Sequence, residues 1–304
     1  MVNYDNNRNK IGGFFMYTDN KIELKLVEFD KYDVLSLVEL STSVGWDYDE
    51  YEVRTVMASG KIYGHKNTVG KIVSSAAIIP YDTNLASIGM VIVNEDYRGL
   101  GLGKKATQKC IDSVSQNTSI MLISTEDGKP LYERLGFSTV DSVHKYLSDN
   151  YIPTNLFNHP QITLERYKEE EIHKIIELDS AAFGDKRGEL LLNRINQSKQ
   201  CLVVKNQNGK IIGFGLSILG PENLLIGPIV APNSQTAALI IDGLVINHQG
   251  KIRIDVPSSN DELMLFLEKS GFIKVSNPPI MIKNSIKMPY RNKELFAIAA
   301  QIFG

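Results

Sequence analysis

The chain has 304 residues, of which 43% are hydrophobic and 22% are charged, and 33 basic residues oppose 35 acidic ones for a net charge of −2. At roughly 150 residues per domain this is enough apolar material for two cores, which excludes a chain that is disordered as a whole. The near-neutral charge argues against a nucleic-acid-binding protein, and no apolar run reaches the roughly 18 residues of a membrane span.

The two cysteines, Cys110 and Cys201, lie far apart in the chain, so they predict neither a disulfide framework nor a paired metal motif. Residues 1–20 begin polar and rich in asparagine, and their apolar patch at Ile11–Tyr17 is too short and too broken by glycine for a secretory signal. We therefore expect a cytoplasmic protein without a metal, in which residues 1–20 form a lead-in.

Apolar residues at alternating or helical spacing predict the elements of the first half. In chain order these are a strand at 21–29, helices at 32–43 and 50–58, strands at 61–65, 71–80 and 85–93, a helix at 104–115, a strand at 119–124, a short helix at 130–135 and a strand at 137–146. The segment Leu85–Val93 is apolar almost throughout, which is typical of a strand covered on both faces.

The segment 150–160 holds two prolines and three asparagines with little periodicity, which indicates a linker. The second half then repeats the order of the first, with strands at 161–166, 201–205, 211–219, 224–230, 251–256 and from 272 onward, and helices at 170–183, 186–196, 234–246 and 261–270. Both halves close with a short helix followed by Gly-Phe, at 136–137 and 271–272. This repeat predicts one fold present twice, as domains at 21–149 and 161–304.

The most informative segment is 98–103, Arg-Gly-Leu-Gly-Leu-Gly, which lies between an apolar strand and an amphipathic helix. The first amides of a helix have no internal partner and carry partial positive charge, so they can bind a phosphate. Glycines let a ligand approach the backbone closely, and Arg98 adds a cation. The segment predicts a pyrophosphate site, and a ligand-free glycine turn is the other interpretation.

Other phosphate loops do not match this segment. A Walker A loop needs GxxxxGK followed by Ser or Thr, and a Rossmann loop needs a third glycine where this chain has Lys104. The metal motif HExxH and the hydrolase motif GxSxG are absent from the sequence.

The loop at 98–103 and the segment Tyr-Glu-Arg-Leu-Gly-Phe at 132–137 together resemble the GNAT superfamily of acyl-CoA-dependent acetyltransferases. The second half, with Ile-Gly-Pro-Ile-Val-Ala at 226–231 and Ile-Asp-Val-Pro at 254–257, resembles the C-terminal GNAT-like domain of bacterial two-domain members. The resemblance implies an α/β fold of two tandem GNAT-like domains, each a mixed central sheet flanked by helices. It also implies an N-acetyltransferase that moves an acetyl group from acetyl-CoA to a primary amine in a ternary complex.

By this resemblance, the pantetheine arm of acetyl-CoA pairs with Val91, Ile92 and Val93, and the Val91 amide polarises the thioester carbonyl. The residues implied to hold the pyrophosphate are Arg98, Gly99, Leu100, Gly101, Leu102, Gly103 and Lys104. Tyr132 takes the position of the general acid that protonates the departing thiolate, with ordinary helix packing as its alternative role. The corresponding second-half loop, 231–236, has neither glycine nor arginine, so we expect it to bind pyrophosphate poorly.

The sequence does not identify a general base. Some family members carry a glutamate on the fourth strand, two residues before the pantetheine segment, where this chain has Gly89. Glu95 and Asp96 lie in the loop before Arg98, where a solvated turn is the other interpretation, and Glu126 and Asp127 close the next strand, near the thiol end by topology. A water chain or a second-domain carboxylate are further options. We assign none of them.

Three residues are candidates for acceptor binding. Asp179 lies on an apolar helical stripe with Ile176 and Phe183, where an unpaired carboxylate is costly, and Asp255 ends a strand. We interpret both as facing an interdomain cleft and binding a cationic amine; a cap or a local hydrogen bond is the alternative. Trp46 follows the first helix, where family members shape the acceptor pocket, and core packing is its alternative role.

The expected partner is a small-molecule or peptide amine, with no nucleic acid and no membrane, and the protein is expected to be a monomer or a homodimer. Three alternatives stay open from the sequence: a non-catalytic acyl-CoA-binding sensor, an interaction protein with a vestigial loop, and an enzyme that uses a different acyl-CoA or acceptor nucleophile.

Overall fold

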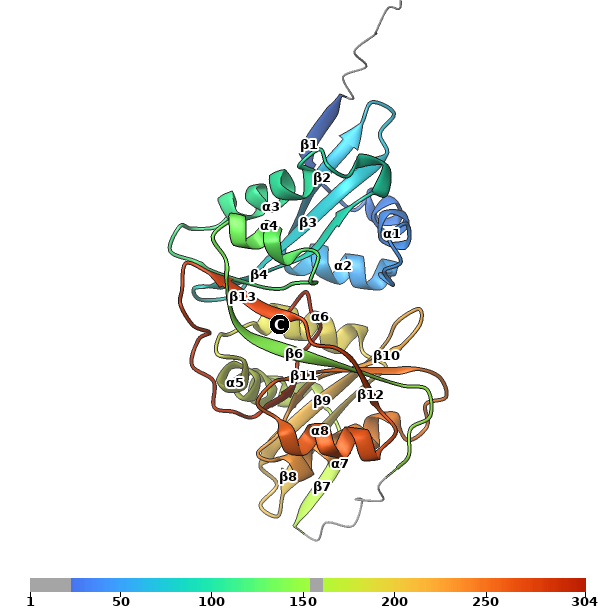
Figure 1. The fold of residues 1–304 in the computed structure, drawn as a ribbon. Coiled ribbons are helices and arrows are strands. Elements are labelled where there is room, and N and C mark those ends of the chain that lie inside the picture. Colours follow the sequence, from blue (N-terminus) through green and yellow to red (C-terminus); the bar gives the residue numbers. More distant parts are fainter. Residues whose placement is uncertain (1–22, 154–160) are drawn as a thin grey trace, which may run out of the picture.

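A computed structural model describes residues 23–153 and 161–304. The predicted lead-in at 1–20 and the greater part of the predicted linker, 154–160, lie outside the described residues. Over the described ranges the strands form one 14-stranded sheet that runs through both halves of the molecule (Figure 1). Its order is β1-β2-β3-β4-β5-β13-β6-β11-β10-β9-β8-β7, with β12 on β6 and β14 on β10.

The first half follows the predicted order of elements. These are β1 (Leu24–Glu28), α1 (Val34–Thr42), α2 (Glu50–Ser59), β2 (Lys61–Asn67), β3 (Ile72–Pro80), β4 (Leu85–Val93), the 3-10 turn η1 (Glu95–Tyr97), α3 (Leu102–Asp112), β5 (Ser119–Ile123), α4 (Lys129–Arg134) and β6 (Ser138–Ser148). Alternate residues of β3 face different helices: Ala76 and Ile78 pack in the cluster that includes α3, whereas Ala77 and Ile79 pack with α1 and α2. The sheet of the first half is therefore covered on both faces.

The second half repeats this arrangement with added strands at its end. Its elements are β7 (Ile162–Arg166), η2 (Glu169–Glu171), α5 (Ile172–Phe183), α6 (Gly188–Gln197), β8 (Gln200–Asn206), β9 (Ile211–Leu219), β10 (Leu224–Val230), α7 (Ser234–Val245), β11 (Ile252–Pro257), α8 (Asp261–Lys269), β12 (Ile273–Ser276), β13 (Pro279–Lys283) and β14 (Leu295–Ala297). The single strand predicted from residue 272 onward is wrong, because this segment divides into three strands with different neighbours.

The two halves exchange strands. Strand β13 comes from the second half but pairs with β5 of the first, placing Ile280 opposite Ile123. Strand β6 belongs to the first half but pairs with β11 of the second, placing Lys145 opposite Asp255. The two copies therefore share a sheet through their main-chain hydrogen bonds.

The last residues of the chain fasten the two halves together. Beyond β14, the amide of Ile298 donates to the Asp255 carbonyl at 3.0 Å, so the segment is held by the second half there. It then reaches the first half, where the Ser87 hydroxyl donates to the Ile302 carbonyl at 2.7 Å. Phe303 is fully buried in a core cluster that contains residues of both halves.

No helix within the described ranges combines the length and the apolar character that a membrane crossing requires.

Candidate active site

Strands β4 and β5 run parallel and then separate. They pair from Leu85 with Ser119 as far as Ile88 with Leu122, where the pairing ends. On its other side β4 carries a bulge, since Ser75 lies opposite Ile92 while Ala77 lies opposite Gly89. Beyond Ile88 the edge of β4 that faces β5 is thus free, within the part of the chain that the structure describes, for hydrogen bonding by another extended group.

The bulge is held by a side chain. Met90 has a positive φ of 52°, which is uncommon for a residue with a side chain, and the Ser75 hydroxyl donates to the Met90 carbonyl at 2.7 Å. This contact fixes the backbone directly before Val91–Val93, the segment expected to face pantetheine.

The glycine loop leads into α3 with its first amides uncapped. Gly101 is the N-cap residue, in the left-handed conformation at φ 71°, and it has no side chain to satisfy those amides. A Cβ atom built at Gly99 or Gly101 would meet nothing within 4 Å, so the loop faces open space. Arg98 is exposed there and pairs with Glu95 at 3.4 Å. These features suit an oxyanion such as a pyrophosphate.

The other residues of this loop have separate roles. Leu102 is buried in the core, while Leu100 and Lys104 are exposed. A Cβ atom at Gly103 would lie 3.3 Å from Cγ2 of Val93, so this position lets α3 pack closely against β4. Gly99 and Gly101 therefore keep the loop open, and Gly103 allows close contact between the helix and the strand.

Tyr132 lies on α4 and is 8% exposed. Its ring packs edge-on against Phe137, with the ring centroids 6.0 Å apart. Burial raises the pKa of Tyr132 well above its usual value, so the phenol stays protonated at neutral pH. It can donate a hydrogen bond or a proton, which is the chemistry predicted for it, although Tyr132 is not among the described residues that line the cavity discussed next.

A cavity of about 450 Å³ lies between the two halves, beside the point where β4 and β5 separate. The first half contributes the loop between α1 and α2, the bulged part of β4 at Gly89 and Met90, and the end of β5 at Thr125 and Glu126. The second half contributes the β9–β10 hairpin, β11, the β12–β13 loop and residues 300–302. The volume is that of a site for a small ligand.

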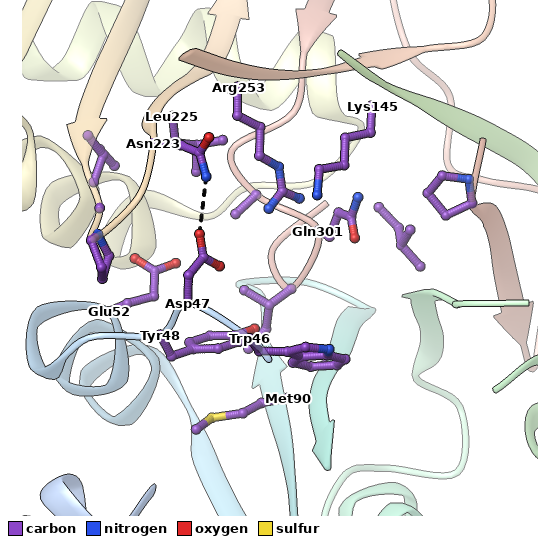
Figure 2. Close-up of a pocket in the computed structure, with 18 of the residues that line it drawn as sticks. Trp46, Asp47, Tyr48, Glu52, Met90, Lys145, Asn223, Leu225, Arg253 and Gln301 are labelled. Carbon is purple, nitrogen blue, oxygen red and sulfur yellow. Dashed lines mark hydrogen bonds between the residues drawn. The ribbon is translucent and has the colours of Figure 1, made fainter. Parts of the chain in front are cut away.

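The cavity has one acidic and one basic wall (Figure 2). The loop after α1 supplies Asp47 and Asp49, and α2 supplies Glu52, whose carboxylate accepts from Nη1 of Arg194 at 2.6 Å. The opposite wall carries Lys145 from β6, together with Arg253 and Gln301. The two walls thus carry opposite charge across the cavity.

The basic wall is organised by Asp255, which is fully buried. Its Oδ2 accepts from Nε and Nη2 of Arg253 at 3.0 and 2.9 Å, and its Oδ1 accepts from Nε2 of Gln301 at 3.2 Å. Burial, and next the charge of Arg253, lower the pKa of Lys145 from its usual value. Asp255 therefore lies behind the cavity wall and holds two residues that line it, so the expectation that it faces the cleft and binds a cationic amine is wrong.

The aromatic side chains form the floor of the cavity. Trp46, 37% exposed, lines the cavity and stacks on Tyr48, with ring centroids 6.2 Å apart. Burial raises the pKa of Tyr48 above its usual value, so this hydroxyl is a neutral donor at physiological pH.

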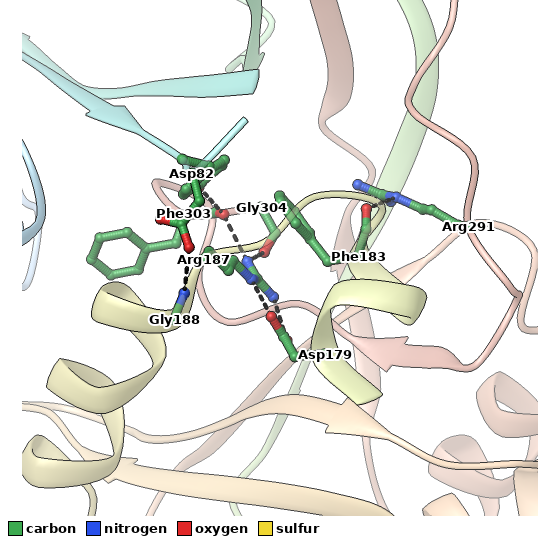
Figure 3. A network of polar contacts seen from close by, with 9 residues as sticks. Asp82, Asp179, Phe183, Arg187, Gly188, Arg291, Phe303 and Gly304 are labelled. Atoms are coloured by element: carbon green, nitrogen blue, oxygen red, sulfur yellow. Dashed lines mark hydrogen bonds and ion pairs between the residues drawn. The ribbon is translucent and has the colours of Figure 1, made fainter. Parts of the chain in front are cut away.

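Asp179 does not lie in the cavity, contrary to our expectation. It is 1% exposed and forms a two-fold contact with Arg187, from Nε at 2.8 Å and from Nη2 at 3.0 Å (Figure 3). Nη1 of Arg187 donates to the carbonyls of Phe303 and Gly304. A buried carboxylate is unfavourable unless it is paired, and Arg187 pairs with Asp179 here. The same arginine also binds the last two residues, so the role of Asp179 is structural and we do not assign it to acceptor binding.

The space that a strand-four glutamate would need is already filled. A Cβ atom at Gly89 would lie 2.5 Å from Cγ1 of Ile302, so a longer side chain cannot enter there without displacing the C-terminal segment. Of the four carboxylates considered as a general base from the sequence, Glu126 lines the cavity. No group of three or more His, Cys, Asp or Glu side chains within 23–153 and 161–304 is arranged to hold a metal ion.

Five charged or polar residues of the cavity were not predicted from the sequence: Asp47, Glu52, Lys145, Arg253 and Gln301. One signal for them was present: Arg253 and Asp255 alternate along one strand and so share a face. The rest depends on the exchange of β6 and on the path of residues 298–304, which no local pattern predicts.

Comparison with known proteins agrees with this architecture. A model of the GNAT acetyltransferase family matches residues 32–137, and a model of an acetyltransferase (GNAT) domain matches residues 175–297. The uncharacterized N-acetyltransferase YitH of Bacillus subtilis (strain 168) is 38% identical over 281 residues, which cover 92% of this chain and 98% of that protein.

Solved structures share the fold. A protein of Pyrococcus horikoshii, provisionally assigned as an acetyltransferase, superposes with a TM-score of 0.76 at 18% identity and covers 98% of this chain and 100% of its own. A tandem GNAT protein from the clavulanic acid biosynthesis pathway gives a TM-score of 0.62 at 12% identity, covering 86% of this chain and 98% of its own. The predicted fold class, two GNAT-like domains in tandem, is confirmed.

Proposed function

The chain belongs to the GNAT acetyltransferase family, and we propose that it transfers the acetyl group of acetyl-CoA to a primary amine bound in the cavity between its halves. The observation that carries this proposal is the position of the point where β4 separates from β5, which lies between an uncapped helix start and a cavity lined by both halves. A thioester bound along β4 would have its phosphates at one end and an acceptor at the other.

Each group of residues has a role in this proposal. The free edge of Val91–Val93 binds the pantetheine arm through main-chain hydrogen bonds, and the amides that follow Gly101, with Arg98, bind the pyrophosphate. The Val91 amide stabilises negative charge on the thioester oxygen. Trp46 and Met90 line the cavity where the acceptor nitrogen would approach.

The reaction forms a C–N bond and breaks the C–S bond, so the amine loses one proton and the departing thiolate gains one. Tyr132, kept protonated by burial, supplies the hydrogen bond or proton to the thiolate. Ile302 occupies the place of a strand-four base, so the proton of the amine leaves through water or through a carboxylate of the cavity wall, such as Glu126.

The test of this proposal is titration calorimetry with acetyl-CoA. The wild type should bind one equivalent per chain, and Gly101→Glu should weaken binding by about 10- to 100-fold, because a carboxylate there competes with the phosphate for the helix amides and a charged hydrogen bond contributes about 1.5–3 kcal/mol. Gly209→Glu is the matched control, since Gly209 has φ 72° and equally open surroundings in the β8–β9 turn. Equal affinity of both variants would contradict the assignment of this loop.

The filled space at Gly89 favours one other function, an acyl-CoA sensor that binds without turnover. Release of free CoA thiol in the presence of an amine panel separates the two. Binding without thiol release for any amine would favour the sensor.

A further inference from the structure

We infer that the acceptor amine carries an anionic group, a carboxylate or a phosphate, which binds to Lys145 and Arg253 on the basic wall of the cavity. The inference rests on the proposed acetyl transfer and adds the chemical class of the acceptor. Figure 2 shows the two cationic side chains projecting side by side into the cavity, opposite Trp46 and Tyr48.

The sheet register brings the two cations together. Lys145 on β6 lies opposite Asp255 on β11, and Arg253 precedes Asp255 by two residues, so the three side chains share one face of the sheet. This juxtaposition depends on the exchanged strand, because β6 and β11 come from different halves. The basic wall is therefore a property of the assembled molecule.

The charges on this wall do not cancel. Asp255 is occupied by Arg253 and Gln301, so it neutralises one cation. Lys145 makes no side-chain hydrogen bond and no ion pair with any residue of the described ranges. Two cations and one carboxylate leave one net positive charge on this half-buried wall.

The other charged groups near Lys145 leave it unpaired. Asp47 across the cavity accepts instead from Nδ2 of Asn223 at 3.4 Å, and Glu222 of the β9–β10 hairpin forms no ion pair with Lys145. The ammonium group is thus half-buried beside the like charge of Arg253, which disfavours its charged form, while Asp255, Asp47 and Glu222 favour that form from a distance without pairing with it. Arg253 is already oriented by Asp255, and an oriented guanidinium suits an oxyanion.

The acidic wall fits the other end of the same ligand. Asp47 and Asp49 line the cavity, with Oδ1 of Asp49 also accepting from the Glu52 amide at 2.7 Å as the cap of α2, and Glu126 lines it from the segment after β5. An acceptor with its anionic group on Lys145 and Arg253 and its ammonium group toward these carboxylates would satisfy both walls. The glycine loop does not contribute to the cavity lining, so the basic wall is separate from the pyrophosphate site proposed above.

The experiment compares matched amines at saturating acetyl-CoA. Amino acids are paired with their carboxamides, and phosphoethanolamine with ethanolamine, and CoA thiol release is followed. One anionic member should exceed its neutral partner by at least about 10-fold in kcat/KM, which corresponds to one charge-assisted hydrogen bond of roughly 1.5–3 kcal/mol. The member that responds distinguishes a carboxylate from a phosphate. Neutral members that react equally well would overturn the inference and leave acetyl transfer intact.

The variant Lys145→Met tests the wall itself. It should raise KM for the anionic acceptor by about 10- to 100-fold while KM for acetyl-CoA stays unchanged. Lys145→Arg should restore part of the loss, and Lys210→Met is the control because Lys210 is exposed in the β8–β9 turn. A rise in KM for acetyl-CoA instead would assign Lys145 to the cosubstrate and contradict the inference.

A binding measurement decides the matter even if no amine is turned over. Thermal stabilisation by a panel of N-acetylated amino acids and N-acetyl phosphoethanolamine is measured for wild type and Lys145→Met. Stabilisation of the wild type that is lost in the variant supports the inference, and no stabilisation by any of them overturns it. Titration with acetyl-CoA tests the proposed function independently. A negative result in either experiment can therefore be interpreted without the other.

The pH dependence of that binding has a definite sign. Lys145 has a lowered pKa, so its charge, and with it the affinity for the anion, is complete below that pKa and declines as the pH rises through it. Burial and then the charge of Arg253 lower the pKa of Lys145, and the carboxylates of Asp255, Asp47 and Glu222 partly raise it again. N-acetylated ligands carry no titrating amine, so wild-type affinity should fall at alkaline pH. Lys145→Met should give a flat, weak profile.

Discussion

The same strand, loop and helix occur once in each half of this molecule. The first amides of the helix have no side-chain cap in the first half and are capped by a side chain in the second. After β4, the helix begins at Gly101 with no side-chain cap, and the loop faces open space. After β10, the helix begins at Asn233, whose side chain accepts from the Thr236 amide at 2.9 Å. Beside it, Ser234 donates to a Glu262 carboxylate, which would repel a phosphate.

The grooves beside the two strands differ in the same way. Both strands part from a parallel neighbour, β4 after Ile88 and β10 after Ile226. In the second half the gap is taken by β14, which places Ala297 opposite Ile229. In the first half no strand of the described ranges pairs with β4 there. In this fold, a groove can bind a ligand where the main-chain groups of one strand edge are left unpaired. In the second half, β14 pairs with that edge, so the groove is closed by the chain itself.

The largest effect we expect concerns the arginines of the two halves. Arg187 is 2% exposed and serves the structure, so Arg187→Met, which strands the Asp179 carboxylate in the core, should lower the free energy of unfolding by about 3–5 kcal/mol. Arg98 pairs only at the surface, so Arg98→Met should change stability by less than about 1 kcal/mol and weaken acetyl-CoA binding instead. Urea denaturation measures the free energy of unfolding, and calorimetry measures the affinity for acetyl-CoA. If both variants lost a similar amount of stability, the proposed difference between a structural and a binding arginine would be wrong.

A second prediction tests how closely the C-terminal segment covers β4. Gly89→Ala places a Cβ atom 2.5 Å from Ile302, and such overpacking costs about 1–3 kcal/mol. Ile302→Ala alone leaves a cavity, at about 2–5 kcal/mol. The double variant should be more stable than the sum of the single losses predicts, because each change relieves the other. Additive losses in urea denaturation would mean that the two residues do not constrain each other.

Local patterns predicted much of this molecule from its sequence. The order of the elements through α8 is as predicted, because amphipathic periods and the glycine turns are local signals, and the two motifs of the first half led to the family. The cavity was not predictable in the same way. Lys145 and Arg253 meet across β6 and β11, and Ile302 reaches Gly89 over more than half of the chain, so these contacts arise only when the halves assemble. Asp179 is the clearest example of a contact that the sequence does not predict. Its position on an apolar stripe indicates that the carboxylate needs a partner, but not that this partner is Arg187.

The smallest expected effect on stability comes from a variant of the second half. It tests whether the cap of α7 or the pairing of β14 prevents that half from binding acetyl-CoA. Asn233→Ala removes the cap of α7 and should cost about 0.5–2 kcal/mol, whereas Asn233→Asp keeps the acceptor oxygen and should cost less. If β14 closes the groove, freeing the helix amides creates no second site, and calorimetry with Asn233→Ala should still give one acetyl-CoA per chain. Two equivalents would show that the cap alone had closed the second copy. A binding site in this fold needs both an open helix end and an open strand edge, and the variant supplies only the first of them.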